Sequence, residues 1–310
     1  MKKIFTLLLV LCGVFSLCAK ELKVLMIGNS FSASVHTYLP KMVEAGKTHK
    51  LKLANAYIGG CTIERHCANI DAEKTKPDFK PYSFVVTGEK SRKEKLSVML
   101  KADKWDIITI QQGSRHSPYK DKTQELSKKL IAFVRALAPQ AEIIVHQTWA
   151  YRADHNWFNG DKAIMTRQKM HDMLTANYTE LAKNNKFRMI PVGNAVQLFR
   201  EKLPVQTVKY TSADLKKLVR PKTLDVTGGD VVGTMSWGKD RKDPKKIVLR
   251  NDRIHLNDKG KYLQACVWYM VLFDETASGI KLDYKHKDAK LIRECAEAAV
   301  KAVRKVTAAR

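Results

Sequence analysis

A serine that directly follows a glycine-led turn is the first residue in the chain able to do covalent chemistry. Ser30 comes after the apolar run Val24–Ile27 and Gly28. The run has no polar alternation, which predicts a buried central strand of a parallel sheet. Ligands of open α/β sheets bind at the carboxyl ends of the strands, where a following helix offers free N–H groups to negative charge. Ser30 is therefore a candidate nucleophile.

An aspartate and a histidine three positions apart form the second chemical motif. Asp252 precedes His255 just before an apolar helical pattern. In a short loop, a carboxylate at this spacing can hold the imidazole Nδ1–H, which leaves Nε2 free to accept the proton of a serine hydroxyl. The two motifs together predict a Ser-His-Asp triad of Ser30, His255 and Asp252, with the latter two in one loop.

These motifs resemble the SGNH (GDSL-like) hydrolase superfamily over roughly residues 21–273. Gly28-Asn29-Ser30-Phe31-Ser32 is similar to the first block of the superfamily, with Asn29 where many members have aspartate. Asp252 and His255 match the last block. The resemblance implies Ser30 as nucleophile and a flavodoxin-like, three-layer α/β/α fold.

The second and third blocks concern the oxyanion donors. Gly60 follows the second expected strand, as the glycine of the second block does, so the resemblance implies the Gly60 and Ser30 N–H groups as donors. Many relatives then have Gly-x-Asn, whereas this chain has Gln111 and Gln112. Either glutamine amide can donate the equivalent hydrogen bond. The best match is a bacterial subgroup of secreted SGNH-like proteins of undefined function with a glutamine-rich third block.

The chain between these motifs alternates strands and helices. This order predicts a doubly wound parallel sheet of about five strands within a three-layer α/β/α domain. Further strands are expected at residues 52–57, 106–111, 142–147 and 187–191, and helices at 124–137 and 163–183. A first helix is expected at 34–46, bent or delayed by Pro40. An additional short strand at 83–87 precedes a helix expected at 92–102.

Residues 1–19 are typical of a secretory signal peptide, with a basic start and a short apolar core. The core is shorter than the roughly 20 residues that a membrane span requires, so no stable span is expected. A retained amino-terminal anchor is the alternative to cleavage. Residues 20–310 are expected to form one exported domain, periplasmic or extracellular, with an irregular insertion around 204–250 and a carboxyl-terminal amphipathic helix from 288.

Charge and cysteine content bear on partners. The formal net charge of +25 favours an anionic partner such as a sulfated or uronic-acid polysaccharide, although scattered charges are also typical of solvated faces. No nucleic-acid-binding motif accompanies the charge, so nucleic acid is not expected. No cofactor is required, and the histidines and cysteines predict no metal site. Cys61 and Cys67 either form a disulfide or remain buried thiols.

The predicted function is a secreted serine esterase that removes an acyl group, expected to be acetyl, from a carbohydrate. Aromatic residues after the fourth strand either contact a sugar ring or pack on the core, and these are Trp149, Tyr151 and Trp157. Two alternatives remain: a carbohydrate-binding protein that keeps the fold without catalysis, favoured by the altered third block, and a lipid or thioester hydrolase.

Overall fold

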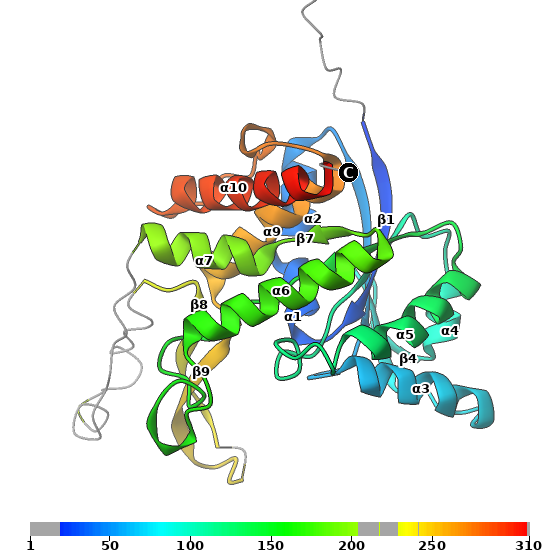
Figure 1. Ribbon diagram of the computed structural model, residues 1–310, viewed down its shortest axis with the longest axis horizontal. Helices are drawn as coiled ribbons and strands as arrows, with labels where there is room; N and C mark the ends of the chain where they lie inside the picture. Colours follow the sequence, from blue (N-terminus) through cyan, green and yellow to red (C-terminus); the bar gives the residue numbers. More distant parts are fainter. Residues whose placement is uncertain (1–18, 204–216, 218–228, 241, 309–310) are drawn as a thin grey trace, which may run out of the picture.

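A seven-stranded sheet forms the centre of the computed structural model, which describes residues 19–203, 217, 229–240 and 242–308 (Figure 1). The strands are β1 (Glu21–Gly28), β2 (Lys50–Tyr57), β3 (Tyr82–Val86), β4 (Arg92–Glu94), β5 (Ile107–Ile110), β6 (Glu142–His146) and β7 (Arg188–Ile190). Their order is β4-β3-β2-β1-β5-β6-β7. The predicted signal peptide and much of the predicted insertion lie outside the described residues.

The predicted fold class is confirmed. Five strands, β2, β1, β5, β6 and β7, pair in parallel, as expected, and β3 and β4 add an antiparallel edge. β1 is central, and its residues from Val24 onward are buried because helices cover both faces. Ser30 therefore leaves the carboxyl end of the central strand.

The helix predicted at 92–102 is wrong in its first part. Residues 92–94 form β4, which pairs antiparallel with β3 across a turn where Gly88 has φ +82°. Ladder hydrogen bonds to β3 take the place of helical ones. Only residues 96–101 form a helix.

Helices cover both faces of the sheet. They are α1 (Ser30–Ala33), α2 (Leu39–Gly46), α3 (Ile63–Thr75), α4 (Leu96–Lys101), α5 (Gln124–Leu137), α6 (Arg167–Asn185), α7 (Val192–Lys202), α9 (Asp258–Phe273) and α10 (Ala289–Ala308), with 3₁₀ turns at Ser34–Thr37, Gly160–Lys162 and Ala277–Gly279. α2 and α10 pack on α9, whereas α3 and α4 pack on α5 at the other side (Figure 1). The predicted carboxyl-terminal helix is confirmed as α10, and it covers the otherwise apolar α9.

The first predicted helix, residues 34–46, is divided into shorter pieces. α1 begins at Ser30 itself, a 3₁₀ turn follows, and α2 begins only at Leu39. Pro40 lies in the first turn of α2, where a residue without an N–H group loses no helical hydrogen bond. Pro40 thus delays this helix rather than bending it.

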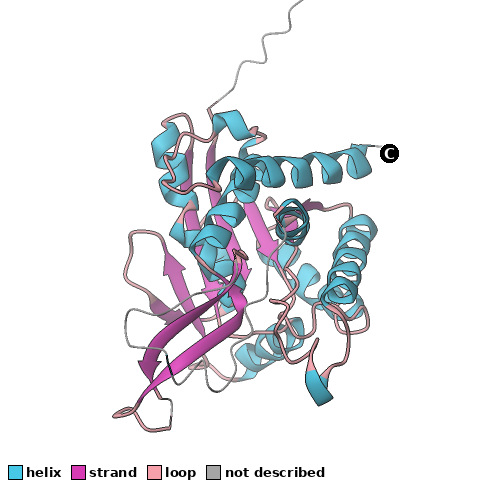
Figure 2. Cartoon of the chain, turned by 90° about the vertical axis from the view of Figure 1, so that its left-hand side faces the viewer, coloured by secondary structure: helices cyan, strands magenta, loops and turns pink. Residues whose placement is uncertain are grey.

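The described part of the predicted irregular insertion contributes to a β-hairpin. β8 (Val232–Lys239) pairs antiparallel with β9 (Ile247–Leu256) outside the main sheet, and Figure 2 shows the hairpin extending away from it. Asp252 and His255 lie in β9. The prediction that they share a loop is wrong, because residues 251 and 252 pair with residues 235 and 234 of β8.

The cysteines of the described chain are free, buried thiols. The Cys67 Sγ faces the Leu126 carbonyl of α5 at 3.4 Å, whereas the Cys61 Sγ lies 3.6 Å from the Thr62 carbonyl. The disulfide alternative for Cys61 and Cys67 is therefore wrong, and the alternative of buried thiols holds. Burial raises the pKa of the Cys61 thiol to about 12.

Candidate active site

The structure brings the three predicted triad residues together. The Ser30 Oγ lies 2.8 Å from the His255 Nε2, and the His255 Nδ1 lies 2.7 Å from the Asp252 Oδ2. When Nδ1–H donates to the carboxylate, Nε2 is left as the acceptor for the Ser30 hydroxyl. The three side chains thus form one directed hydrogen-bond chain, from the end of β1 to β9.

Asp252 is held as a charged carboxylate. Its Oδ1 accepts hydrogen bonds from the backbone N–H groups of Ile254 at 2.8 Å and His255 at 3.0 Å. Burial alone raises the pKa of this carboxyl group, but the hydrogen bonds from the His255 ring and the two backbone groups outweigh burial and bring the pKa well below its ordinary value. The carboxylate can therefore orient the imidazole over the whole physiological pH range.

Aromatic side chains form the wall behind His255. The Phe31 ring stacks on Trp149, with centroids 4.0 Å apart, and meets the His255 ring edge-on at 5.7 Å. The Trp149 indole N–H donates to the Ile254 carbonyl at 2.9 Å. Trp149 and Tyr151 are 1% and 0% exposed, so of the two roles predicted for them the structure favours packing. Trp157, the third predicted aromatic residue, is half-buried.

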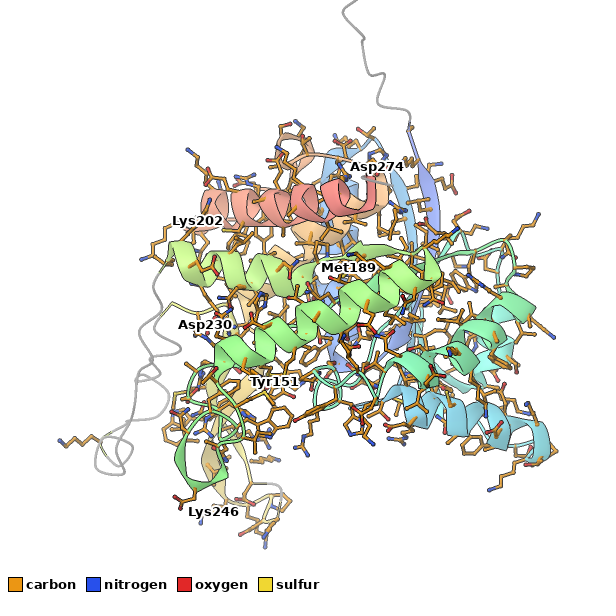
Figure 3. The ribbon with its side chains drawn as sticks, viewed as in Figure 1. Tyr151, Met189, Lys202, Asp230, Lys246 and Asp274 are labelled. Carbon is orange, nitrogen blue, oxygen red and sulfur yellow. The ribbon has the colours of Figure 1, made fainter. Side chains whose placement is uncertain are left out.

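Two arginines anchor the loop after β6 to the hairpin. The Arg152 N–H donates to the Arg253 carbonyl at 2.9 Å, and the Arg152 guanidinium binds Asp154 and the Asn251 side chain. The buried Arg200 pairs with Asp230 and also donates to the carbonyls of residues 150 and 151. Figure 3 labels Tyr151 and Asp230, two of the residues that this junction involves. These bonds fix β9 relative to Ser30.

Gly60 lies in a tight turn tied to the nucleophile. Gly60 has φ +61°, and the Cys61 N–H donates to the Ile58 carbonyl at 3.2 Å. The Asn29 Nδ2 donates to the Cys61 carbonyl at 2.9 Å, while its Oδ1 caps α1 by accepting from the Phe31 N–H at 3.0 Å. Asn29 thus connects the predicted oxyanion turn to Ser30. Sequence reasoning missed this role, although an asparagine just before a helix is a common capping signal.

The two glutamines of the third block have different environments. The Gln112 side chain accepts from the N–H groups of Ile63 and Gly113 at 2.8 Å each and donates to the Lys122 carbonyl. The Gln111 Nε2 instead donates to the Asn29 Oδ1 at 2.9 Å. Gln112 therefore supports the start of α3, whereas only Gln111 places its amide nitrogen against the nucleophile turn.

Comparison with known proteins places this chain in a family. The model of a domain of unknown function, DUF4886, matches residues 23–208. The chain belongs to the DUF4886 family. The matched region contains Ser30, Gly60 and both glutamines but ends before Asp252 and His255, so the hairpin that completes the site lies beyond it.

Solved structures similar to the DUF4886 protein include another member of its family. The crystal structure of a DUF4886 protein from Bacteroides uniformis is 24% identical, with 93% of this chain and 96% of that chain covered and a TM-score of 0.66. An acetylxylan esterase from Geobacillus stearothermophilus is 13% identical (87% and 99% covered, TM-score 0.45), and a GDSL-like lipase from Bacteroides thetaiotaomicron is 13% identical (81% and 88%, 0.39). A GDSL-like protein is thus among the similar structures. No curated protein matches the sequence.

A buried histidine fixes the orientation of Gln111 in the DUF4886 protein. The His146 Nδ1 lies 2.7 Å from the Gln111 Oε1, and its Nε2 lies 3.4 Å from the Gln264 Nε2. Gln264 accepts from the Ser34 hydroxyl through Oε1, so its Nε2 is the donor and the His146 Nε2 the acceptor. Hence His146 Nδ1–H donates to Gln111, which in turn donates to Asn29. Sequence reasoning assigned no role to His146 or Gln264.

Burial lowers the pKa of His146 from its ordinary value of 6.5 to about 3. At a pH between these two values the unfolded chain binds a proton that the folded protein excludes. The free energy of unfolding therefore decreases by up to ~1.4 kcal/mol for each unit by which the pH is lowered. We expect His146→Gln to lose less stability than the wild type between pH 6.5 and 4, measured by urea unfolding. His116→Gln, at the surface, is the control. Parallel pH profiles for wild type and His146→Gln would contradict this assignment.

Among the residues that the structure describes, no helix is both long and apolar enough to cross a membrane. Within the same residues, no group of three or more histidine, cysteine or acidic side chains is arranged to hold a metal ion.

Proposed function

We propose that this DUF4886 protein is an exported serine esterase that removes an acetyl group from a carbohydrate by a Ser-His-Asp mechanism. The observation that carries the proposal is the continuous hydrogen-bond chain from the Ser30 Oγ through His255 to Asp252, with distances of 2.8 and 2.7 Å. Such a chain, in which the base touches the nucleophile and a carboxylate orients the base, is how a serine hydroxyl is activated.

The first half-reaction forms an acyl-enzyme. As the Ser30 Oγ attacks the ester carbonyl carbon, its proton passes to the His255 Nε2, and the carbonyl oxygen becomes an oxyanion. The carbon–oxygen bond to the sugar then breaks, and His255 returns the proton to the leaving alcohol oxygen. In the second half-reaction His255 takes a proton from a water whose oxygen attacks the acyl carbon. The bond from that carbon to the Ser30 Oγ then breaks, His255 returns the proton to Oγ, and acetate leaves. Asp252 stabilises the imidazolium in both steps.

The oxyanion is stabilised by N–H groups around Ser30. Ser30 is the first residue of α1, where a backbone N–H has no partner within the helix. Gly60 supplies a second N–H from the turn that Asn29 holds. We assign the third donor to Gln111, because its Nε2 carries a second proton beyond the one given to Asn29.

Mutation of each glutamine distinguishes the catalytic role proposed for Gln111 from the structural role of Gln112. Loss of one oxyanion donor lowers kcat by roughly 10²–10³-fold, so we expect Gln111→Ala to lower kcat to that extent with little change in KM. Gln112→Ala should instead lower the melting temperature, because it leaves the Ile63 and Gly113 N–H groups without their acceptor. Steady-state kinetics and thermal unfolding of both variants test the assignment. A larger fall in kcat for Gln112→Ala would reverse it.

The exposure of the site favours a bulky, polar alcohol over a lipid. The His255 and Asp252 side chains are 45% and 35% exposed, so the reacting atoms are reachable from a wide surface. The described residues include an apolar groove of about 470 Å³, but it is lined by parts of α6, β7 and α10 and contains no triad residue. These observations support a carbohydrate ester rather than an acyl chain held in a tunnel.

A fluorophosphonate probe tests the proposal before any substrate is known. The probe phosphonylates an activated serine, so we expect covalent labelling of the wild type at Ser30, located by peptide mass mapping, and none in Ser30→Ala. The competing proposal, a carbohydrate-binding protein without catalysis, predicts no labelling of either protein under conditions that label a reference serine esterase.

A further inference from the structure

A cluster of three aromatic rings lies beside the triad. The Tyr151 ring is 4.5 Å from the His155 ring and 5.4 Å from the Trp157 ring, centroid to centroid, and the last two are 5.8 Å apart. Tyr151 is fully buried, whereas His155 and Trp157 are partly exposed. The Tyr151 hydroxyl donates to the Ser114 Oγ at 2.8 Å. The cluster is thus joined to the loop after β5 and offers ring surface to a ligand.

Two arginines, Arg115 and Arg253, lie near this cluster. Arg115 follows Ser114, is exposed, and makes no hydrogen bond or ion pair with any other described residue. Arg253 lies on β9 two residues before His255. Its Nε donates to the Asp154 Oδ2 at 3.0 Å and its Nη1 to the Asn156 Oδ1 at 3.2 Å. The Arg253 Nη2 has no partner in the described chain, and the side chain is 33% exposed.

The positive charge of the cluster is not balanced locally. Arg152 and Arg253 share one carboxylate, Asp154, and Arg152 is almost fully buried. Besides burial, the largest cause, the charges of Arg253 and Arg115 both lower the pKa of His155, against the opposite effect of Asp154. Both guanidinium groups are thus close enough to His155 to disfavour its protonation. The nearby Glu64 carboxylate is held by the His116 Nδ1 at 2.7 Å.

Both arginines lie on segments that build the catalytic site. A Cβ added to Gly113 would lie 2.9 Å from the Cys61 carbonyl oxygen, so the loop with Arg115 abuts the proposed oxyanion turn. Arg253 shares β9 with Asp252 and His255, and its carbonyl binds the Arg152 N–H. Arg253 thus lies two residues from His255 on β9 and Arg115 two residues after the glycine that abuts the oxyanion turn, so both are on segments that carry groups of the catalytic site.

We propose that Arg115 and Arg253 form a subsite for a carboxylate on the sugar, with the sugar ring against Trp157 and His155. Guanidinium groups match carboxylates in planar, bidentate geometry, and aromatic faces pack on the apolar side of a sugar ring. The preferred substrate is then an acetylated acidic sugar, such as an acetylated uronic acid. This inference rests on the proposed function and specifies its substrate class.

Two matched substrates test the subsite. Mono-O-acetylated methyl glucuronoside and mono-O-acetylated methyl glucoside differ only in a carboxylate against a hydroxymethyl group. We expect a higher kcat/KM for the glucuronoside in the wild type. Hydrogen bonds to charged groups are strong enough that Arg115→Gln and Arg253→Gln should each lower this value by roughly 10-fold, mainly through KM, and each should lower it more on the glucuronoside than on the glucoside.

The control variants distinguish a loss of charge from a loss of structure. They also distinguish failure of this subsite from failure of the proposed esterase activity. Arg115→Lys should keep part of the preference, and Arg92→Gln, an exposed arginine on β4, should keep all of it. The preference should also weaken as salt rises, because exposed charges are screened. Hydrolysis of both substrates at equal rates, with Ser30 required, would overturn the subsite and leave the esterase intact.

Binding provides a readout without turnover. Calorimetry of the Ser30→Ala protein with the acetylated glucuronoside should show binding that weakens about 10-fold when either arginine is also replaced by glutamine. If Ser30→Ala binds the glucuronoside and the glucoside equally, or if the arginine replacements leave the affinity unchanged, the subsite proposal is wrong even for a protein that proves not to be an esterase.

Discussion

Ser30→Ala and His255→Ala are each expected to lower kcat for ester hydrolysis by roughly 10⁴–10⁶-fold. Without Ser30 no acyl-enzyme forms, and without His255 the hydroxyl 2.8 Å away has no acceptor for its proton. Because the two residues act as a unit, the double variant should be little worse than either single one. Turnover of 4-nitrophenyl acetate, with the initial burst of nitrophenol, measures both effects.

The matched control is Ser91→Ala, which changes an exposed serine in the turn before β4 and should keep wild-type turnover. Ser30→Ala and His255→Ala should also keep their melting temperatures within a few degrees, because neither removes a core side chain. Wild-type activity in Ser30→Ala, on an ester that the protein cleaves, would refute the nucleophile assignment. The non-catalytic binding protein would then be the better proposal.

The parts of the fold that could be predicted are those with a strong local pattern. The run Val24–Ile27 indicates β1 because a short, continuous apolar run that ends at a glycine is typical of a strand covered on both faces. β4 gives no such signal: Arg92-Lys93-Glu94 is charged and exposed, and it is a strand only because it pairs with β3. Strand formation at a sheet edge depends on pairing with the neighbouring strand, which the residues of the edge strand do not themselves indicate, and this explains the wrong helix prediction there.

The residues of the candidate site likewise include some that have a local sequence signal and some that have none. Asp252 and His255 could be found because their contact spans three residues, and Ser30 because its turn has a recognisable composition. The hydrogen bonds from His146 to Gln111 and from Gln111 to Asn29 join the ends of three strands. Nothing in the sequence spacing of these residues indicates that they are in contact. Trp149 was ambiguous for the same reason, since its role depends on stacking against Phe31 from another strand end.

Asp252→Asn should lower kcat by as much as ~10⁴-fold, the effect of the equivalent change in a serine protease. The asparagine Oδ1 can still accept from the Ile254 and His255 N–H groups, so β9 should stay in place. The Nδ2 that replaces the Oδ2, however, is a donor facing the His255 Nδ1. It forces the ring proton onto Nε2, which then can no longer accept the proton of Ser30.

If the Asp252 carboxylate acts by setting the tautomer of His255, its replacement by asparagine lowers activity without changing the geometry of the site. Asp252→Asn should keep the wild-type melting temperature and bind substrate with an unchanged Kd, yet react with the fluorophosphonate probe far more slowly. Asp283→Asn, an exposed aspartate outside the site, should match the wild type in every assay. If Asp252→Asn retained kcat within tenfold of the wild type, the carboxylate would not be needed to set the tautomer. His255 would then have to be oriented by its packing against Phe31 and by the anchored hairpin alone.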